Sequence, residues 1–296
     1  MNKVVAVITT YNRLGMLQCC IRKLEQQSVP CDILVINNAA TDGTAEYLQQ
    51  IKNDRLKYYT LDENVGSSGG FSYGVRKAVE HGYEYVWIMD DDCFPETDAL
   101  YNFLKADNEL NGNYGWLSSK CLWLDGTICE MNLQRKTPYT DIKLANKKFI
   151  PSQMATFVSL FLRTETVKKY GLPIKEFYIW VDDWEYTRRI SRKLPCYVVT
   201  NSSVVHAMKN KTIVNITNDS IERLPRYQYC YRNDVYLYRR EGVMGWVWLI
   251  AKDMWHSVQI LMNKKDVLEK LKLVWRGMWK GIWFKPEIEY VEEINF

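Results

Sequence analysis

The sequence lacks the features of secreted, membrane-spanning and low-complexity chains. No apolar run approaches the ~20 residues that a bilayer-spanning helix needs, and the longest, around Met244–Ala251, is about half that length. The 8 cysteines are scattered without a CxxC pair, which is typical of free thiols in a reducing cytosol and not of a disulfide framework. The opening MNKVVAVITT has no small-residue cleavage site, so we expect a strand there and not a signal peptide.

The composition predicts a folded globular protein. Hydrophobic residues make up 47% of the chain and charged residues 25%, which is enough for a sizeable core and excludes intrinsic disorder. The sequence contains no internal repeat and no Pro/Gly/Ser-rich linker. A length of 296 residues therefore favours one large α/β domain with an appendage.

Charge is unevenly distributed along the chain. Residues 1–206 carry 24 basic and 24 acidic side chains, whereas residues 223–285 carry 13 basic and 5 acidic ones. Six of the 11 tryptophans lie in that second stretch: Trp246, Trp248, Trp255, Trp275, Trp279 and Trp283. The chain thus divides into a neutral body and a basic, tryptophan-rich C-terminal region.

The first third of the chain alternates buried strands with amphipathic helices. Continuous apolar runs predict strands, and apolar residues at helical spacing predict helices between them. In chain order these are Val4–Thr9, Leu14–Gln27, Asp32–Asn37, Asp42–Ile51, Leu56–Thr60, Phe71–His81 and Tyr85–Met89. This recurrence predicts βαβ units and a mostly parallel sheet. Strands are expected later within Gly115–Leu124, Gln153–Arg163 and Cys196–Thr200, and helices from about Leu224 onward.

Three adjacent aspartates, Asp90, Asp91 and Asp92, follow the expected strand Tyr85–Met89. Ligands of open α/β sheets bind at the carboxyl ends of strands, and carboxylates suit hard cations such as Mg²⁺ or Mn²⁺. A bound cation would also relieve the repulsion among three like charges. The alternative is a solvated acidic turn, but the apolar strand directly before the triplet favours a metal site.

A second acidic motif, Trp180–Glu185, places three carboxylates among aromatic residues. An apolar environment raises the pKa of a carboxylate and suits it to act as a general base. The same residues would also fit a helix N-terminus, where acidic side chains cap the first turn and interact favourably with the helix dipole. The two roles are compatible, with one aspartate capping and the other catalytic.

Two weaker signals accompany these motifs. His206, one of only 3 histidines, follows the expected strand Cys196–Thr200 and is a candidate metal ligand, although a lone histidine is often structural. The glycine-rich segment Asn64–Phe71 is expected to form a loop whose backbone N–H groups bind phosphate at a helix N-terminus. It matches neither GxGxxG nor the Walker loop, which argues against nicotinamide and P-loop classes.

Together these motifs resemble those of family 2 nucleotide-sugar glycosyltransferases of the GT-A fold, a Rossmann-like α/β fold. The likeness rests on VITTYNR (7–13), INNAATDGT (36–44) and the DxD-type Asp90–Asp92. Asn64–Phe71 and Trp180–Glu185 narrow it to the galactofuranosyltransferase branch, with rhamnosyltransferases as close relatives. The resemblance covers about residues 3–206 and implies a GT-A domain over 1–210, followed by a helical, basic, tryptophan-rich region over 211–296.

The resemblance also implies a role for each motif residue. Nucleotide and donor binding would fall to Thr9, Asn38, Asn64, Gly69, Gly70, Asp90 and Asp91. A divalent metal, Mn²⁺ or Mg²⁺, would be bound by Asp90, Asp92 and His206. Asp183 would be the catalytic base, and the acceptor or sugar pocket would contain Trp180, Asp182, Trp184 and Glu185. The family usually has Asp where this chain has Asn37–Asn38, which leaves the recognition of uracil or thymine open.

The implied activity is inverting, metal-dependent transfer of galactofuranose from UDP-galactofuranose to a glycan or lipid-linked acceptor in cell-surface polysaccharide synthesis. A metal neutralises the diphosphate leaving group and one carboxylate deprotonates the acceptor hydroxyl, which suits a single displacement. Two alternatives stay open: a rhamnosyltransferase that uses dTDP-rhamnose, and a catalytically silent sugar-nucleotide-binding protein. Nucleic-acid binding is not expected, because the C-terminal tryptophans recur at helical spacing and do not form a stacking sheet.

The C-terminal region also predicts contact with an anionic membrane surface. Residues at steps of three and four share one helix face: Leu268, Leu271, Trp275, Met278 and Ile282. Packing of this face against the body is the alternative, but tryptophan beside Lys and Arg is typical of helices that lie at a membrane interface. We therefore expect a cytoplasmic protein that is peripheral on the cytoplasmic face of the membrane.

Overall fold

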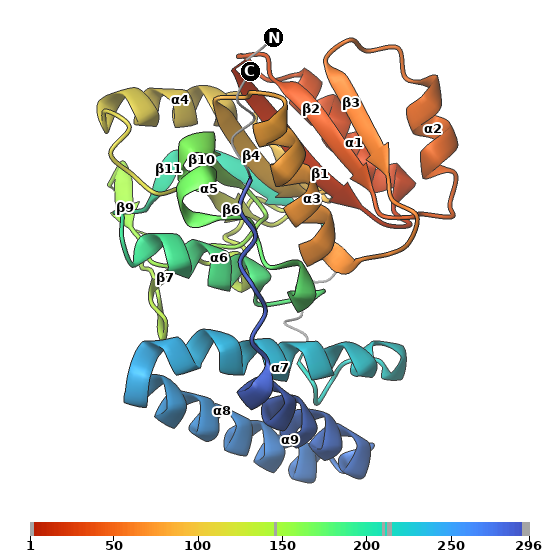
Figure 1. Cartoon of the computed structure of the whole chain (residues 1–296), viewed down its shortest axis with the longest axis vertical. Coiled ribbons are helices and arrows are strands. Elements are labelled where there is room, and N and C mark those ends of the chain that lie inside the picture. Colours follow the sequence, from red (N-terminus) through yellow and green to blue (C-terminus); the bar gives the residue numbers. More distant parts are fainter. Residues whose placement is uncertain (1–2, 145–146, 209–210, 212–214, 292–296) are drawn as a thin grey trace.

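The computed structural model describes residues 3–144, 147–208, 211 and 215–291 and is built around a nine-stranded mixed sheet (Figure 1). The strands are β1 Val4–Thr10, β2 Asp32–Asn37, β3 Leu56–Thr60, β4 Tyr85–Asp90, β5 Cys93–Pro95, β6 Leu117–Leu122, β9 Phe149–Pro151, β10 Leu160–Arg163 and β11 Tyr197–His206. Their order across the sheet is β3-β2-β1-β4-β10-β6-β11-β5, and β9 also pairs with β11. A separate small hairpin joins β7 Arg135–Thr137 and β8 Thr140–Asp141.

The helices lie on both faces of this sheet and in a layer beyond it (Figure 1). They are α1 Leu14–Glu25, α2 Thr44–Gln50, α3 Gly66–Glu80, α4 Ala99–Glu109, α5 Thr164–Tyr170, α6 Asp182–Ser191, α7 Tyr227–Tyr238, α8 Gly242–Asn263 and α9 Val267–Trp283. Short 3₁₀ turns lie at η1 Glu130–Asn132, η2 Lys175–Phe177, η3 Ile221–Arg226 and η4 Arg239–Glu241.

The first third of the chain has the predicted architecture. β1 pairs in parallel with β2 and β4, and β2 pairs in parallel with β3. Every residue of β1 and β2 is buried, because α1 and α4 cover one face of the sheet while α3 and α5 cover the other. The α/β class, with a mostly parallel sheet and helices at the C-terminal end, is confirmed.

The second half of the sheet differs from the prediction in two places. Of the strand expected within Gln153–Arg163, only β10 (Leu160–Arg163) forms, because residues before it bond outside the sheet, as Ala155 does with the Thr187 hydroxyl. β9 precedes the expected span and pairs with β11. β11 continues past the expected end at Thr200, so His206 is its last residue. A register shift between Val199 and Ser203 lets the strand pass its polar residues and resume pairing with β6.

The glycine-rich segment expected as a loop is mostly helix, which corrects the prediction. α3 begins at Gly66, whose φ is +76°, and a Cβ atom there would lie 2.0 Å from the carbonyl oxygen of Tyr178. A Cβ atom on Gly70 would lie 2.5 Å from Cγ2 of Thr9. The glycines are therefore needed so that α3 can pack directly on the end of β1 and on the turn at Tyr178.

α7, α8 and α9 form the helical layer, with α8 and α9 on the side of α7 that faces away from the sheet (Figure 1). α9 lies close to α7 because Gly277 and Gly281 face it, and a Cβ atom on Gly281 would lie 2.6 Å from Cβ of Val235. After α9 the chain runs back along the body, where the Glu289 carbonyl accepts a hydrogen bond from the Leu172 N–H. The domain boundary predicted between 210 and 211 falls at a stretch where 209–210 and 212–214 lie outside the described residues.

The face of α9 that packs inward differs from the apolar stripe for which membrane contact was predicted. The residues that pack inward are Lys270, Val274, Gly277 and Gly281. Of the predicted stripe, Leu268 and Trp275 are exposed and the other members are half-buried. Apolar residues occupy more than one side of this helix, and the small glycines decide which side approaches α7. No helix in the described part of the chain is long and apolar enough to cross a bilayer.

Candidate active site

The carboxyl ends of β1, β2 and β4 meet at one edge of the sheet. Thr9 lies opposite Asp90 across the β1–β4 ladder, and Thr10 lies opposite Asn37 across the β1–β2 ladder. The Oγ1 atom of Thr9 is buried without a hydrogen-bond partner among the described residues. Buried hydroxyl groups are nearly always hydrogen-bonded, so this orphan points to a ligand at the edge.

The three aspartates predicted as a metal motif have different environments. Asp91 accepts hydrogen bonds from Thr10 Oγ1 at 2.7 Å and from Arg13 Nη1 at 3.1 Å, and Asp92 accepts one from the same nitrogen of Arg13 at 2.6 Å. Both carboxylates are buried. Asp90 is half-buried, and no hydrogen bond or ion pair from the described residues holds its side chain. Asp90 is therefore the member of the triplet whose carboxylate is open to a ligand.

His206 reaches this cluster through the pairing of β11 with β5, which places it opposite Cys93. Its Nε2 atom lies 3.3 Å from Asp92 Oδ1, its Nδ1 atom lies 2.8 Å from Asn132 Oδ1, and its ring stacks on Trp123. Because Asn132 can only accept at that oxygen, Nδ1 carries the proton and Nε2 is the atom turned toward Asp92. This is the arrangement in which a neutral histidine ligates a metal.

The pKa values in the cluster follow from burial and charge. Burial raises the pKa of Asp90 to about 7, and the negative charge of Asp92 adds to the shift. Burial also acts to raise the pKa of Asp92, but contacts with His206 and Arg13 outweigh it and lower that pKa to about 2. Burial lowers the pKa of His206 less than Asp92 raises it, to about 10. Without a metal, Arg13 and the His206 imidazolium therefore balance the acidic charge.

A carboxylate–imidazole donor set of this kind fits a divalent cation. Ligand atoms of Asp92, Cys93 and His206 lie within 4.8 Å of one another, and the charge on Asp90 interacts with those on Asp92 and His206. Carboxylate oxygens with one imidazole suit Mn²⁺ or Mg²⁺. Asp92 and His206 thus supply one carboxylate and one imidazole donor of the kind that such a metal takes, and the charge of Asp90 acts on both.

The second acidic motif follows a strained turn. Tyr178, Trp180 and Val181 have φ values of 65°, 65° and 67°, a region that costs non-glycine residues of order 1–3 kcal/mol each. Asn233 of α7, which is fully buried, holds this turn. Its Nδ2 atom donates hydrogen bonds to the carbonyl oxygens of Phe177 at 3.0 Å, of Ile179 at 3.2 Å and of Trp180 at 2.9 Å. The C-terminal helices therefore fix the direction in which α6 enters the site.

Asp182 and Asp183 are the first two residues of α6 and lie in the same electrostatic environment as Asp90. Burial raises the pKa of Asp183 well above its usual range, and the charges of Asp182 and Asp90 add to this shift. Burial raises the pKa of Asp182 to about 6, against the opposing effect of the Ser68 hydroxyl. Asp183 is half-buried and Asp182 is buried, so Asp183 is the more accessible of the two.

The other residues of the Trp180–Glu185 motif are engaged within the fold. Glu185 is buried, and its carboxylate pairs at 3.0 Å with Arg189 of the same helix. The Trp184 ring lies 3.8 Å below the guanidinium carbon of Arg135. The Trp180 ring packs on Tyr227 of α7, with ring centroids 4.9 Å apart.

The predicted nucleotide-binding residues Asn38 and Asn64 hold the start of α3. Asn38 donates hydrogen bonds to Asn64 Oδ1 and to the Gly66 carbonyl, both at 3.0 Å, and accepts one from the Val65 N–H. The N–H groups of Gly66 and Ser68 are bound by Asn64 and by the Tyr178 carbonyl. Several of the N–H groups predicted to bind phosphate thus donate to groups within the protein, and these asparagines hold the start of α3 in place.

Several residues of the cluster were not assigned a role from the sequence. Arg13, Asn132, Trp123 and Asn233 each contact a predicted site residue or its turn. Arg13 belongs to the VITTYNR motif and could have been found there. Asn132 and Asn233 lie 74 and 53 residues from the groups they contact, and no local pattern marks them.

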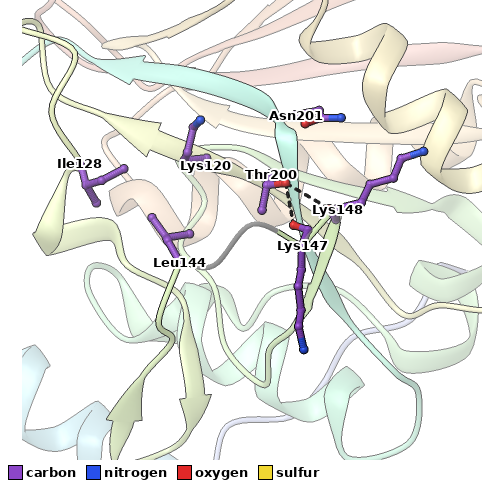
Figure 2. Close-up of a pocket in the computed structure, with 7 residues that line it drawn as sticks. All are labelled: Lys120, Ile128, Leu144, Lys147, Lys148, Thr200 and Asn201. Atoms are coloured by element: carbon purple, nitrogen blue, oxygen red, sulfur yellow. Dashed lines mark hydrogen bonds between the residues drawn. The ribbon is translucent and has the colours of Figure 1, made fainter.

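A separate depression of about 780 Å³ lies beside β11 (Figure 2). Its lining residues are Lys120, Ile128, Leu144, Lys147, Lys148, Thr200 and Asn201. Figure 2 shows the Thr200 hydroxyl bonded to the backbone of Lys147 and Lys148. None of these residues belongs to either acidic motif, so the depression is distinct from the candidate active site.

Comparison with known proteins identifies relatives of this chain. Residues 5–115 match the family described as Glycosyl transferase family 2. Galactofuranosyltransferase GlfT1 from Mycolicibacterium smegmatis is 21% identical over 277 residues, which cover 84% of this chain and 90% of that protein. The resemblance to family 2 is therefore confirmed, and the family match lies in residues 5–115.

Solved structures establish the fold. TarS (residues 1–349) from S. aureus aligns with a TM-score of 0.58 and 14% identity, over 96% of this chain and 72% of that one. Mannosyltransferase PcManGT from Pyrobaculum calidifontis, solved with GDP-Man and Mn²⁺, aligns with a TM-score of 0.57 and 15% identity, over 96% of this chain and 76% of that one. The fold is accordingly that of GT-A glycosyltransferases.

Proposed function

We propose that this protein is an inverting, metal-dependent glycosyltransferase that transfers a sugar from a nucleotide donor to an acceptor hydroxyl. The observation that carries the proposal is the meeting of two acidic motifs at one edge of the sheet, where the charges of Asp90 and Asp183 interact. The motif Asp90–Asp92 has carboxylates that can bind a cation, and the motif Trp180–Glu185 supplies the half-buried carboxylate of Asp183, whose pKa is raised. Metal-assisted glycosyl transfer uses the cation to neutralise the leaving diphosphate and the carboxylate to deprotonate the acceptor.

Asp90, Asp92 and His206 are the proposed metal ligands, with Mn²⁺ or Mg²⁺ as the cation. When bound, the cation would neutralise the diphosphate of the donor. Asn132 keeps the proton of His206 on Nδ1, and Arg13 orients Asp92 through the 2.6 Å hydrogen bond. The structure of PcManGT contains Mn²⁺ and GDP-Man, which supports a divalent metal as the cofactor.

Asp183 is the proposed base. Its carboxylate accepts the proton of the acceptor hydroxyl as the acceptor oxygen forms a bond to the anomeric carbon. The bond from that carbon to the diphosphate breaks, and its electron pair leaves with the nucleotide. A single displacement of this kind inverts the anomeric carbon, and a second carboxylate nucleophile is not required.

The nucleotide half of the site is proposed at the ends of β1 and β2. The buried hydroxyl group of Thr9 has no hydrogen-bond partner among the described residues and would face the donor. Asn38, Asn64, Gly69 and Gly70 shape this pocket through the close packing of α3 on β1. On the acceptor side we place Trp180, Asp182 and Trp184, which line the entry to α6, with Glu185 behind them.

Galactofuranose from UDP-galactofuranose is the proposed donor sugar, because the match to GlfT1 over 84% of this chain supports it. The acceptor is proposed to be a glycan or a lipid-linked glycan of the cell envelope, used on the cytoplasmic side. Residues 1–210 would form the transferase domain and 211–296 the helical region that supports it.

The test is mass spectrometry of products from a panel of sugar nucleotides with lipid-linked acceptors, in the presence of Mn²⁺. Transfer from UDP-galactofuranose is the expected result. Transfer from dTDP-rhamnose alone would identify the protein as a rhamnosyltransferase. Donor binding with neither transfer nor donor hydrolysis would identify it as a catalytically silent sugar-nucleotide-binding protein. Neither binding nor turnover with any donor would refute the proposal.

A further inference from the structure

The outer surface of α8 and α9 is unusually apolar for a face in contact with solvent. We call the following exposed side chains the apolar platform: Val243, Met244, Val247, Trp248, Ile250, Met254, Trp255, Val258, Leu261, Met262, Leu268, Trp275, Trp279 and Trp283. Their exposed fractions run from 39% for Trp248 to 79% for Val243. Monomeric soluble proteins rarely expose a contiguous apolar patch of this kind, and a large exposed apolar patch marks an interaction surface.

α8, which is described in full, has no exposed charged residue over its 22 positions. Its only Lys and Asp, Lys252 and Asp253, turn inward, where Lys252 pairs with Asp234 of α7. A helix that faces water normally carries its charges on the outer side. α8 has the opposite arrangement, so its outer side is suited to an apolar environment.

Basic side chains border the platform along α9 and its ends. Exposed ones are Lys264, Lys265, Lys272, Arg276, Lys280 and Lys285, against the exposed acidic residues Asp266 and Glu269 in the same stretch. Long basic side chains can lie along apolar surface while their charges reach the headgroup level. A second copy of this chain would bring two basic borders together, whereas anionic lipid headgroups complement them.

The platform lies one helix layer from the active site. Asn233 of α7 holds the turn before Asp182, and α8 and α9 pack on the side of α7 that faces away from the sheet (Figure 1). Packed helices lie about 8–10 Å apart. A surface on which α8 and α9 rest would therefore be close to the entry of α6.

We propose that the apolar platform docks this protein on the surface of an anionic lipid bilayer, with α8 and α9 lying flat in the interface. The 22 residues of α8 would extend roughly 33 Å along that surface. The platform residues have no part in the acidic cluster, so the docking proposal and the proposed sugar transfer can be tested independently.

Co-sedimentation of the full chain with vesicles tests this proposal. Vesicles of phosphatidylcholine alone are compared with vesicles that also contain phosphatidylglycerol, at low and high salt. We expect sedimentation with the anionic vesicles that weakens as salt rises, since charge attraction is screened over roughly 10 Å at 0.1 M salt. No sedimentation with either vesicle would overturn the proposal.

Two variants and a matched control make the test specific. The double variant Val247→Glu with Met254→Glu should lower partitioning by at least tenfold, whereas Leu124→Glu, at an equally exposed apolar residue of the body, should not. Lys272→Gln with Arg276→Gln should lower binding to anionic vesicles by about 30-fold. Circular dichroism and donor hydrolysis check that each variant is folded. Unchanged binding by the double variant, or a dimer in light scattering that this variant dissociates, would refute docking on lipid.

Discussion

Replacing Asp183 with asparagine removes the proposed base while it leaves the local structure in place. Asp183 Oδ1 accepts a hydrogen bond of 2.7 Å from the Trp184 N–H, and the amide oxygen of asparagine can accept the same bond. The side chain is half-buried and no cation pairs with it among the described residues, so its neutral substitute leaves no charge uncompensated. The start of α6 and the turn before it should therefore persist.

The expected loss in kcat is about 10²–10⁴, the usual contribution of a positioned general base. Donor affinity should stay within a few fold, because the proposed nucleotide- and metal-binding residues lie outside α6. The raised pKa of Asp183 gives a further expectation. A base must be deprotonated to act, so the wild-type rate should fall as pH decreases through this raised pKa. The Asp183→Asn variant should lack that limb.

The assay is transfer to a lipid-linked acceptor at saturating donor, with donor binding measured by calorimetry on the same preparations. Asp182→Asn is the matched control, since it changes the adjacent carboxylate in the same turn of α6. A variant Asp183→Asn that retains full turnover would refute the assignment. If Asp182→Asn is the inactive variant instead, the base is the neighbouring residue.

Three further results are expected. EDTA should abolish transfer and Mn²⁺ should restore it. The variant Asp92→Ala should lose Mn²⁺-dependent donor binding in calorimetry, while circular dichroism shows that it is folded. Full activity after chelation would contradict the metal site. Asn233→Ala removes three hydrogen bonds from the strained turn, so it should lower the free energy of unfolding by about 1–3 kcal/mol in urea and reduce kcat more than donor affinity. Burial acts to raise the pKa of Asp107, but hydrogen bonds from Arg163, Tyr114 and Tyr85 outweigh burial and lower that pKa. The ionised carboxylate therefore stabilises the folded protein at pH values above the unfolded pKa of about 3.9, and this stabilisation is lost as pH falls through the lower folded pKa. Asp107→Asn should therefore destabilise the protein by about 3 kcal/mol at pH 7 and less at pH 2, as measured by thermal unfolding.

The sequence by itself determined the first four strands and their parallel arrangement. β1, β2 and β4 are continuous apolar runs, and such runs fold only where both faces of a sheet are covered. Because the acidic triplet follows one of these runs directly, its place at the edge of the sheet was also predictable. The same holds for Asp182 and Asp183, whose position at a helix start follows from local composition.

Only the tertiary structure decided how the glycine-rich segment folds and which face of α9 is buried. Gly66 and Gly70 let α3 pack against Tyr178 and Thr9, and those contacts join residues far apart in the chain. On α9, apolar residues occupy more than one side, so periodicity predicts an amphipathic helix but not its orientation. Close packing of Gly281 on α7 settles that.

The supporting groups of the site were likewise beyond the sequence. Asn132 fixes the imidazole of His206, and Asn233 holds the turn before α6, each across more than fifty residues of chain. A single buried amide has no periodicity and no motif, since its role depends on which backbone oxygens the fold brings to it. Local pattern determined which residues carry charge at the site, and long-range packing determined which of them are held and which are free.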